Sequence, residues 1–320
     1  MTGRLYAIVM LASMSCWALV NPIQMLGQEV GPVHTEMRNV TYHFAPAVSV
    51  KIVSLSGSLV PTKEGRWPVF DEPASFNIHV DTSRILVPPA DLAAVLNKYV
   101  FSAKDAPLRD VSAAVEKGQL KIKGKLHSKG DIAFELLATV SANPDGRVRM
   151  HTDKVKALHV PVKGLMDLFG IEIDDLIKNG KVPGLEAEKD DLLLNLDDVL
   201  PAPKIQGPVK DIHIEGGFLV LLLGKWERTS GSEKGRTSPE NGNYMAFKGN
   251  HLQFGKLLMS DTDLTILDLD ANDPLDFFLE RYKDQLVPGY TKITPGFGLR
   301  SYMKDFNKLQ SKGQATAHSQ

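Results

Sequence analysis

Histidines, carboxylates and a single cysteine are the side chains of this sequence best suited to chemistry, but their spacing matches no familiar catalytic motif. The chain contains no Gly-x-Ser-x-Gly nucleophile elbow, no phosphate-binding glycine loop and no His-Glu-x-x-His pair. The nine histidines are scattered, and the nearest group, formed by His127, His151 and His159, lacks the spacing of metal ligands. We therefore predict a non-enzymatic protein with no catalytic residue, no metal ligand and no cofactor.

The densest acidic segment, Asp261–Asp273, invites a calcium site because Ca²⁺ requires several oxygen ligands. The EF-hand pattern fails twice, however. With Asp268 as the first ligand, Asp273 occupies the position that requires glycine, and Leu279 occupies that of the bidentate glutamate. The simpler interpretation is a strand with an acidic, solvent-facing side and a buried side that carries Leu264, Ile266 and Leu269.

The composition is that of a folded protein that does not bind nucleic acid. A chain of 320 residues suffices for one large or two ordinary domains. Its 43% hydrophobic and 23% charged residues exclude wholesale disorder. With 37 basic and 38 acidic side chains the net charge is −1, whereas nucleic-acid-binding proteins carry an excess of positive charge. One cysteine excludes a disulfide framework.

The amino terminus has the features of a secretory signal. Arg4 is followed by Leu5–Val20, an apolar segment in which only two serines are strongly polar. This segment is shorter than the ~20 residues of a typical membrane span. We predict that residues 1–27 are a signal peptide, or else an uncleaved membrane anchor, and that the protein is exported to the periplasm or secreted. Cys16 is either removed with the signal or lipid-modified, as in a bacterial lipoprotein.

From Val40 onward, apolar residues alternate with polar ones, which is typical of strands with one buried face. Turn sequences separate successive strands, as Lys117-Gly118 and Gly216-Gly217 do. This rhythm predicts an antiparallel meander, and hence an α+β fold built on long, curved antiparallel sheets. The clearest predicted strands are 40–44, 48–52, 76–80, 111–115, 120–126, 132–140, 148–152 and 218–223.

Three segments have the three- and four-residue spacing of amphipathic helices. The first follows Pro88-Pro89 and the second follows Pro161. The third has Asp273 as its predicted N-cap and Pro274 at its first helical position, with an apolar stripe that ends at Leu286. The apolar faces of the first two helices carry Leu92, Val95 and Leu96, and Leu165, Met166 and Phe169.

The first two helices belong to a predicted internal repeat. Val87-Pro88 aligned on Val160-Pro161 superimposes their apolar positions at an offset of 73 residues (160 − 87). Further on, Glu116-Lys117 matches Glu188-Lys189 at an offset of 72 (188 − 116), and a fainter third copy begins at Pro274. The alternative is that strand–proline–helix patterns coincide by chance in an α+β protein.

Composition changes along the chain predict its organisation. Lys225–Asn243 is polar and rich in serine, glycine and charge, and the final residues lack apolar periodicity. We therefore predict a β-rich, repeat-containing domain at 28–224, a linker or loop at 225–243, a smaller α+β lobe at 244–308 and a disordered tail at 309–320.

Two strands are apolar without alternation. Phe218–Leu223 and Leu192–Leu194 are continuous apolar runs, so both faces of each strand should leave water. One face can pack on helices while the other lines a groove, because exposing many such side chains is costly without a ligand or partner. A second sheet covering that face would explain the same residues equally well.

Two phrases of the sequence resemble a known family. They are Val115–Gly124 (VEKGQLKIKG) and Gly207–Val220 (GPVKDIHIEGGFLV), within a likeness that covers about Val48–Gly224. They are similar to the LmeA-like phospholipid-binding proteins of bacterial envelopes and, more loosely, to tubular lipid-binding and AsmA-type groove proteins. The resemblance implies a curved sheet wrapped around helices, an apolar trough for acyl chains and no catalytic residues. It makes the six apolar helix residues named above candidate lipid contacts.

The leading hypothesis is an exported, non-enzymatic protein that holds or shuttles a lipid or other apolar molecule in a groove between sheet and helices, with contact to a membrane surface as a further expectation. A second hypothesis is a structural or assembly protein of the cell envelope, in which the repeat is packed dry and Asp261–Asp273 faces a protein partner. A third is a hydrolase that uses scattered carboxylates.

Overall fold

The computed structural model describes residues 31–104, 106, 108–127, 131–157, 184–225, 242–306 and 309. Most of these residues form β-strands, with a few short helices, which confirms the α+β class. Several predictions concern residues outside the described part of the chain: the amino-terminal signal with Cys16, the second helix with Leu165, Met166 and Phe169, nearly all of the 225–243 linker and nearly all of the tail.

The larger of the two main sheets has eleven strands, and it is antiparallel over most of its width. Its path runs β11-β12-β3-β2-β1-β13-β16-β19-β18, with β10 beside β3 and β17 beside β1. Three contacts are parallel: β10 with β3, β17 with β1, and β19 with β16. The strands are β1 (Val33–Ala45), β2 (Val48–Pro61), β3 (Phe76–Val87), β10 (Ile205–Gln206), β11 (Val209–Glu215), β12 (Phe218–Gly224), β13 (Tyr244–Gly249), β16 (Thr262–Asp268), β17 (Leu275–Phe278), β18 (Tyr290–Ile293) and β19 (Leu299–Met303).

The second sheet is a six-stranded antiparallel meander in the order β4-β5-β6-β7-β9-β8. The predicted turns close its hairpins: Lys117 and Gly118 have φ of 51° and 78°, the left-handed values of a tight two-residue turn. The strands predicted from alternation are therefore confirmed in both sheets. The six are β4 (Leu108–Glu116), β5 (Gln119–His127), β6 (Asp131–Ala142), β7 (Val148–Ala157), β8 (Leu185–Glu188) and β9 (Asp191–Leu194), and a separate hairpin is formed by β14 (Leu252–Phe254) and β15 (Leu257–Met259).

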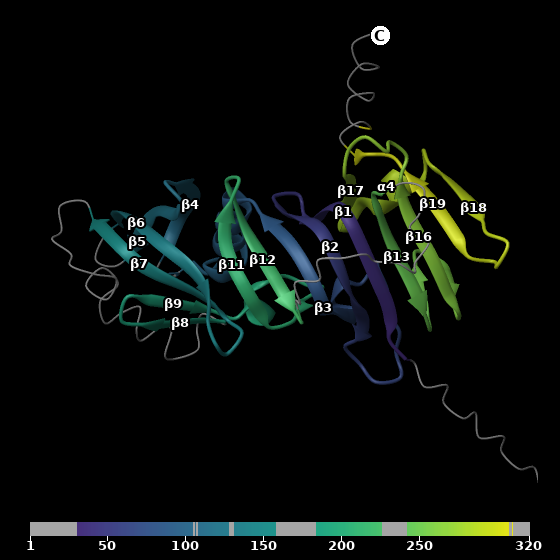
Figure 1. Cartoon of the computed structure of the whole chain (residues 1–320), viewed down its shortest axis with the longest axis horizontal. Helices are drawn as coiled ribbons and strands as arrows, with labels where there is room; N and C mark the ends of the chain where they lie inside the picture. Colours follow the sequence, from purple (N-terminus) through teal and green to yellow (C-terminus); the bar gives the residue numbers. More distant parts are fainter. Residues whose placement is uncertain are drawn as a thin grey trace, which may run out of the picture.

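The two sheets lie along the long axis of the molecule (Figure 1). The six-stranded sheet occupies one end, β11 and β12 follow it, and β18 lies at the other end. Most of the buried apolar side chains of both sheets belong to one core cluster. Because β13 pairs with β1, the strands β13, β16, β17, β18 and β19 extend the same sheet that contains β2 and β3.

The helices are short. The first predicted helix is confirmed as α1 (Pro89–Val95), which continues into the π-helical turn η2 (Leu96–Val100). Pro89 stands in its first turn, where a missing N–H costs nothing. The other helical segments in the described part of the chain are α3 (Leu196–Val199), α4 (Tyr282–Leu286) and the 3₁₀ turns η1 (Pro73–Ser75) and η3 (Leu279–Arg281).

The third predicted helix is wrong over its first half. Pro274 precedes strand β17, not a helix, and Asp273 is not an N-cap; only Tyr282–Leu286 is α-helical. Leu275 and Phe277 are buried and alternate with half-buried residues, which is a period of two. Pairing with β1 makes this segment a strand. Beyond Arg38, β1 no longer pairs with β13, and its edge pairs with β17 from Val40 opposite Leu275 onward. The third copy of the predicted repeat therefore lacks its helix.

The first two copies of the repeat remain a prediction, because the helix of the second copy lies outside the described residues. Their matched hairpins do share one feature. Lys117 and Lys189 both adopt left-handed φ, 51° and 55°, at the β4–β5 and β8–β9 turns.

An aromatic cluster fixes the loop between β2 and β3 onto the larger sheet. Phe70 is 2% exposed, and its ring centroid lies 4.7 Å from that of Phe254 and 5.3 Å from that of Phe247. Phe76, Phe277 and Tyr282 complete the cluster. Aromatic pairs at these distances add to the stabilisation that burial of their area provides.

We expect Phe70→Ala to lower the free energy of unfolding by about 3–5 kcal/mol, because it opens a cavity in a close-packed aromatic cluster. Equilibrium denaturation by urea measures this change. The matched control is Val287→Ala, at a residue that is 85% exposed, where we expect a change within about 0.5 kcal/mol. Equal effects of the two substitutions would contradict the assignment of Phe70 to the core.

Candidate functional site

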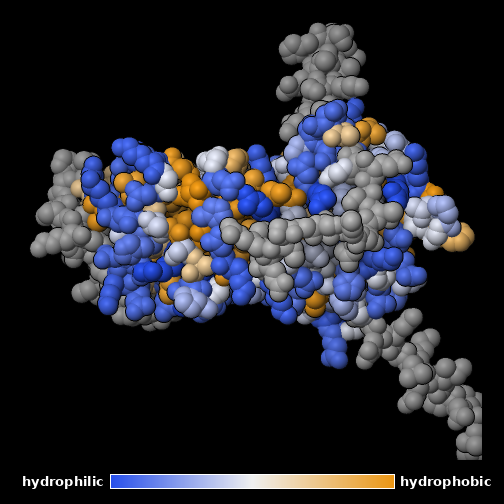
Figure 2. All heavy atoms as spheres, viewed as in Figure 1, coloured by the Kyte–Doolittle hydropathy of each residue, from blue (hydrophilic) through white to orange (hydrophobic). Residues whose placement is uncertain are grey.

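An apolar cavity lies where the two sheets meet. It has a volume of about 90 Å³ and is lined from the larger sheet by β1, β2, β3, β10, β11 and β12, and from the smaller sheet by β6, β7 and β9. Leu221 of β12 lines it from the larger sheet and Val140 of β6 from the smaller one. Figure 2 shows hydrophobic side chains gathered on the visible face over and beside β11 and β12, between more hydrophilic regions.

Strand β12 supplies one wall because its sequence does not alternate. Leu219, Leu221 and Leu223 share one face of the strand and line the cavity. Val220 and Leu222 lie on the opposite face and are buried as well. The prediction that both faces of 218–223 leave water is confirmed, with Phe218 half-buried at the start. Leu192–Leu194 is likewise buried, and Leu194 lines the cavity.

Helix α1 covers the cavity with two of the predicted site residues. Leu92 and Val95 both line it, whereas Leu96 is 5% exposed and packs in the core without reaching the lining. The α3 turn contributes Leu196 and Val199 from a segment that sequence analysis left unassigned. The signal that could have found this turn is its N-cap, since an asparagine precedes two aspartates there.

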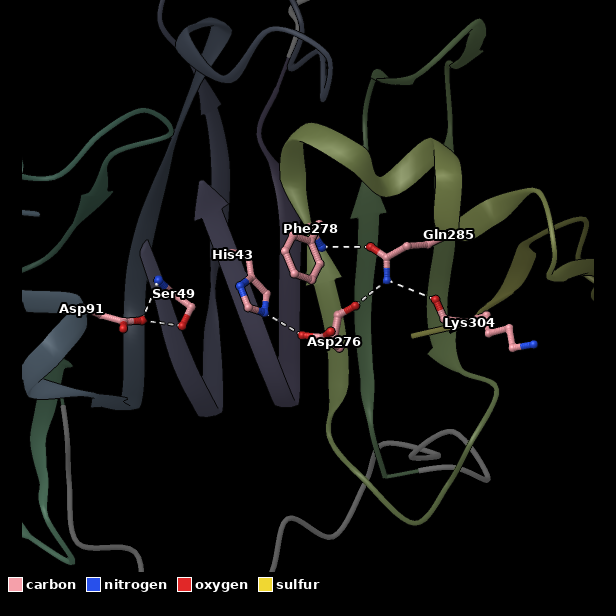
Figure 3. Close-up of polar contacts among 7 residues, drawn as sticks. All are labelled: His43, Ser49, Asp91, Asp276, Phe278, Gln285 and Lys304. Carbon is pink, nitrogen blue, oxygen red and sulfur yellow. Dashed lines mark hydrogen bonds and ion pairs between the residues drawn. The ribbon is translucent and has the colours of Figure 1, made fainter. Parts of the chain in front are cut away.

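A polar pair fastens α1 to the sheet at the edge of the cavity. Ser49 of β2 donates to the Asp91 carboxylate from its backbone N–H, at 2.8 Å, and from its hydroxyl (Figure 3). Both residues line the cavity, yet the exposed surface of the cavity is apolar throughout. The polar atoms of Ser49 and Asp91 therefore bond to each other, and no polar group of the described residues is exposed to the cavity.

The α3 turn places negative charge beside this wall. Asn195 caps it by accepting from the Asp197 N–H at 3.2 Å, and it donates to the Asp198 carboxylate at 2.7 Å. The pKa of Asp197 is raised, first by desolvation on burial and then by the neighbouring charge of Asp198. Both effects disfavour a second anion at this position.

A second polar cluster lies around β17 (Figure 3). His43 Nε2 lies 2.6 Å from Asp276 Oδ1, and the His43 ring stacks on Phe278 with centroids 3.8 Å apart. Gln285 is fully buried; it accepts from the Phe278 N–H at 2.9 Å and donates to the carbonyls of Asp276 and Lys304. These contacts join β17, α4 and the end of β19 to β1, and we assign them a structural role.

The acidic segment differs from its prediction. Leu264 and Ile266 are buried as expected, but Leu269 is 43% exposed, and Asp268 is only 1% exposed. Both faces of β16 are buried along the strand, and only Asp263 is exposed, so the strand has no long solvent-facing side. Oxygens of Asp268, Asp273 and Asp305 lie within 4.8 Å of one another. Sequence analysis missed Asp305, and a cluster of acids alone does not establish a metal site.

Comparison with protein-family models, curated proteins and solved structures finds no match to this chain. Among the described residues, no helix combines the length and apolar character needed to cross a membrane.

We expect Asp91→Ala to lower the free energy of unfolding by about 1–3 kcal/mol, because it leaves the Ser49 N–H and hydroxyl without their acceptor. The double variant Ser49→Ala, Asp91→Ala should lose less than the sum of the two single changes, as coupled groups do. Urea denaturation of all three variants gives the coupling free energy. Asp81→Ala, at an exposed carboxylate on β3, is the matched control. Strict additivity of the changes at Ser49 and Asp91 would contradict a coupled interaction between these two residues.

Proposed function

We propose that this chain is an exported, non-enzymatic binding protein that holds the hydrocarbon chain of a lipid in the cavity between its two sheets. The observation that carries this proposal is the chemistry of the lining. Apart from Ser49 and Asp91, which bond to each other, every described lining residue is apolar. Such a site offers burial without polar recognition, which suits an alkyl chain and suits no charged substrate.

The size of the cavity sets how such a chain would bind. At about 90 Å³ it is smaller than the ~150 Å³ cavity that accommodates a benzene molecule. It therefore holds only the end of a chain in this conformation, and a longer chain has to widen it. The covering elements α1 and α3 are short, so we expect these elements to move when the cavity widens. The bond between Ser49 and Asp91 attaches α1 to β2 and would limit how far α1 moves.

The affinity for a lipid should depend on the length of its hydrocarbon chain more than on its head group. Each methylene that moves from water into the cavity contributes about 0.8 kcal/mol. Affinity should therefore rise with chain length until the widened cavity is full, while the head group stays outside in water. The two carboxylates of α3, Asp197 and Asp198, make its edge unfavourable for an anionic group.

The decisive experiment is native mass spectrometry of the full chain purified from a bacterial periplasm, with organic extraction of the same sample. We expect discrete added masses that are released as lipid. In parallel, displacement of a fluorescent fatty alcohol by unlabelled alcohols should give affinities that increase with chain length. A clean unliganded mass with no uptake from supplied vesicles would overturn the proposal and favour an envelope assembly protein.

We expect Val95→Phe to weaken binding of a long-chain alcohol by roughly tenfold or more, because the ring occupies the space of about two methylenes at 0.8 kcal/mol each. The same displacement assay measures it. Val155→Phe makes the same change on β7 outside the lining and should leave affinity unchanged. Thermal denaturation verifies that both variants fold, and equal affinities of both variants would contradict binding in this cavity.

A further inference from the structure

The β18–β19 hairpin and the residues before it expose an unusual number of large apolar side chains. Val287 is 85% exposed, Tyr290 46%, Ile293 71% and Phe297 89%. Together they are half of the eight large hydrophobic residues that are exposed in the described part of the chain. The hairpin forms one end of the long molecule, opposite the six-stranded sheet (Figure 1). This group, which we name the apolar tip, is remote from the cavity.

The turn of the hairpin is ordered by its own hydrogen bonds. The Thr294 N–H donates to the Gly298 carbonyl at 2.7 Å, and the Gly298 N–H donates back to the Thr294 hydroxyl at 2.9 Å. Phe297 lies between two glycines with φ of +62°, a left-handed conformation that bulky residues rarely adopt. A glycine would take this position without strain. The strained backbone therefore presents a phenyl ring to solvent at the outermost turn.

The charged side chains of the hairpin itself are all basic, although the Asp263 carboxylate of β16 lies against its turn at Gly298. Between Leu286 and Lys304 every charged side chain is basic: Lys292, Arg300 and Lys304. Lys292 lies directly across from Arg300, and neither forms an ion pair with the described residues. The Lys292 ammonium lies 5.4 Å from the ring centroids of both Tyr290 and Tyr302, which stack on each other.

We propose that the apolar tip docks onto the surface of an anionic lipid bilayer. Phe297 and Ile293 would enter the boundary between head groups and acyl chains, the tyrosines would lie at the head-group level, and Lys292 and Arg300 would face the phosphates. The basic side chains of Lys292 and Arg300 favour an anionic lipid surface as the partner. An added protein strand fits less well, because the free edge of β18 is only four residues long and carries a lysine. This proposal does not depend on ligand binding in the cavity.

A fluorescent probe at the tip tests insertion in the full chain. In a Cys16→Ser background, Phe297→Cys is labelled with nitrobenzoxadiazole, and Val53→Cys, on β2, provides the matched exposed site. With vesicles of equal parts phosphatidylglycerol and phosphatidylcholine, we expect a blue shift and increased emission at 297 and none at 53. No response at 297, or equal responses at the two sites, would overturn the proposal.

Vesicle co-sedimentation measures what the tip contributes. Phe297→Asn with Ile293→Thr should lower partition at least tenfold, and the asparagine tolerates the left-handed backbone. Lys292→Gln and Arg300→Gln should each lower it about fivefold on anionic vesicles and not on pure phosphatidylcholine. Unchanged partition, or a change of oligomeric state in its place, would overturn docking to lipid.

Discussion

Burial of both faces of β12 is the constraint on which the arrangement of the two sheets depends. The strand carries five consecutive buried residues from Leu219 to Leu223, and exposing side chains of this kind would cost roughly 1.5–3 kcal/mol each. The face that carries Leu221 leaves water because the six-stranded sheet lies against it, with β6 beside β11. The cavity is the space that the side chains of two separately twisted sheets leave unfilled.

A second constraint acts on β1, which holds the far half of the larger sheet together. It pairs with β2 and β13 as an inner strand, and part of its length also pairs with β17. His43, Asp276 and the fully buried Gln285 satisfy polar groups along this seam, where unpaired groups would be costly. Strands from both ends of the chain therefore share one sheet and one core.

The cavity and the apolar tip differ in the polar and charged residues that surround them. The cavity lies between the two sheets, and among the described residues its polar side chains are Ser49 and Asp91, which are bonded to each other. The apolar tip is open to solvent and is bordered by Lys292 and Arg300. The apolar lining of the cavity suits hydrocarbon, whereas an exposed apolar group with basic neighbours suits a surface that is apolar inside and anionic outside.

The sequence by itself determined the strands of the meander, the tight turn at Lys117-Gly118, the first helix and the double burial of β12, because these follow from local periodicity and turn chemistry. Leu92 and Val95, which the family resemblance makes candidate lipid contacts, line the cavity. Tertiary structure alone decided that Leu275–Phe278 is a strand, since the edge of β1 outweighs a helix-like pattern with a proline at its start. It alone brought Ser49 to Asp91 and Asp305 to Asp268. Such contacts join residues far apart in the chain, and no local pattern encodes which distant strands will lie side by side.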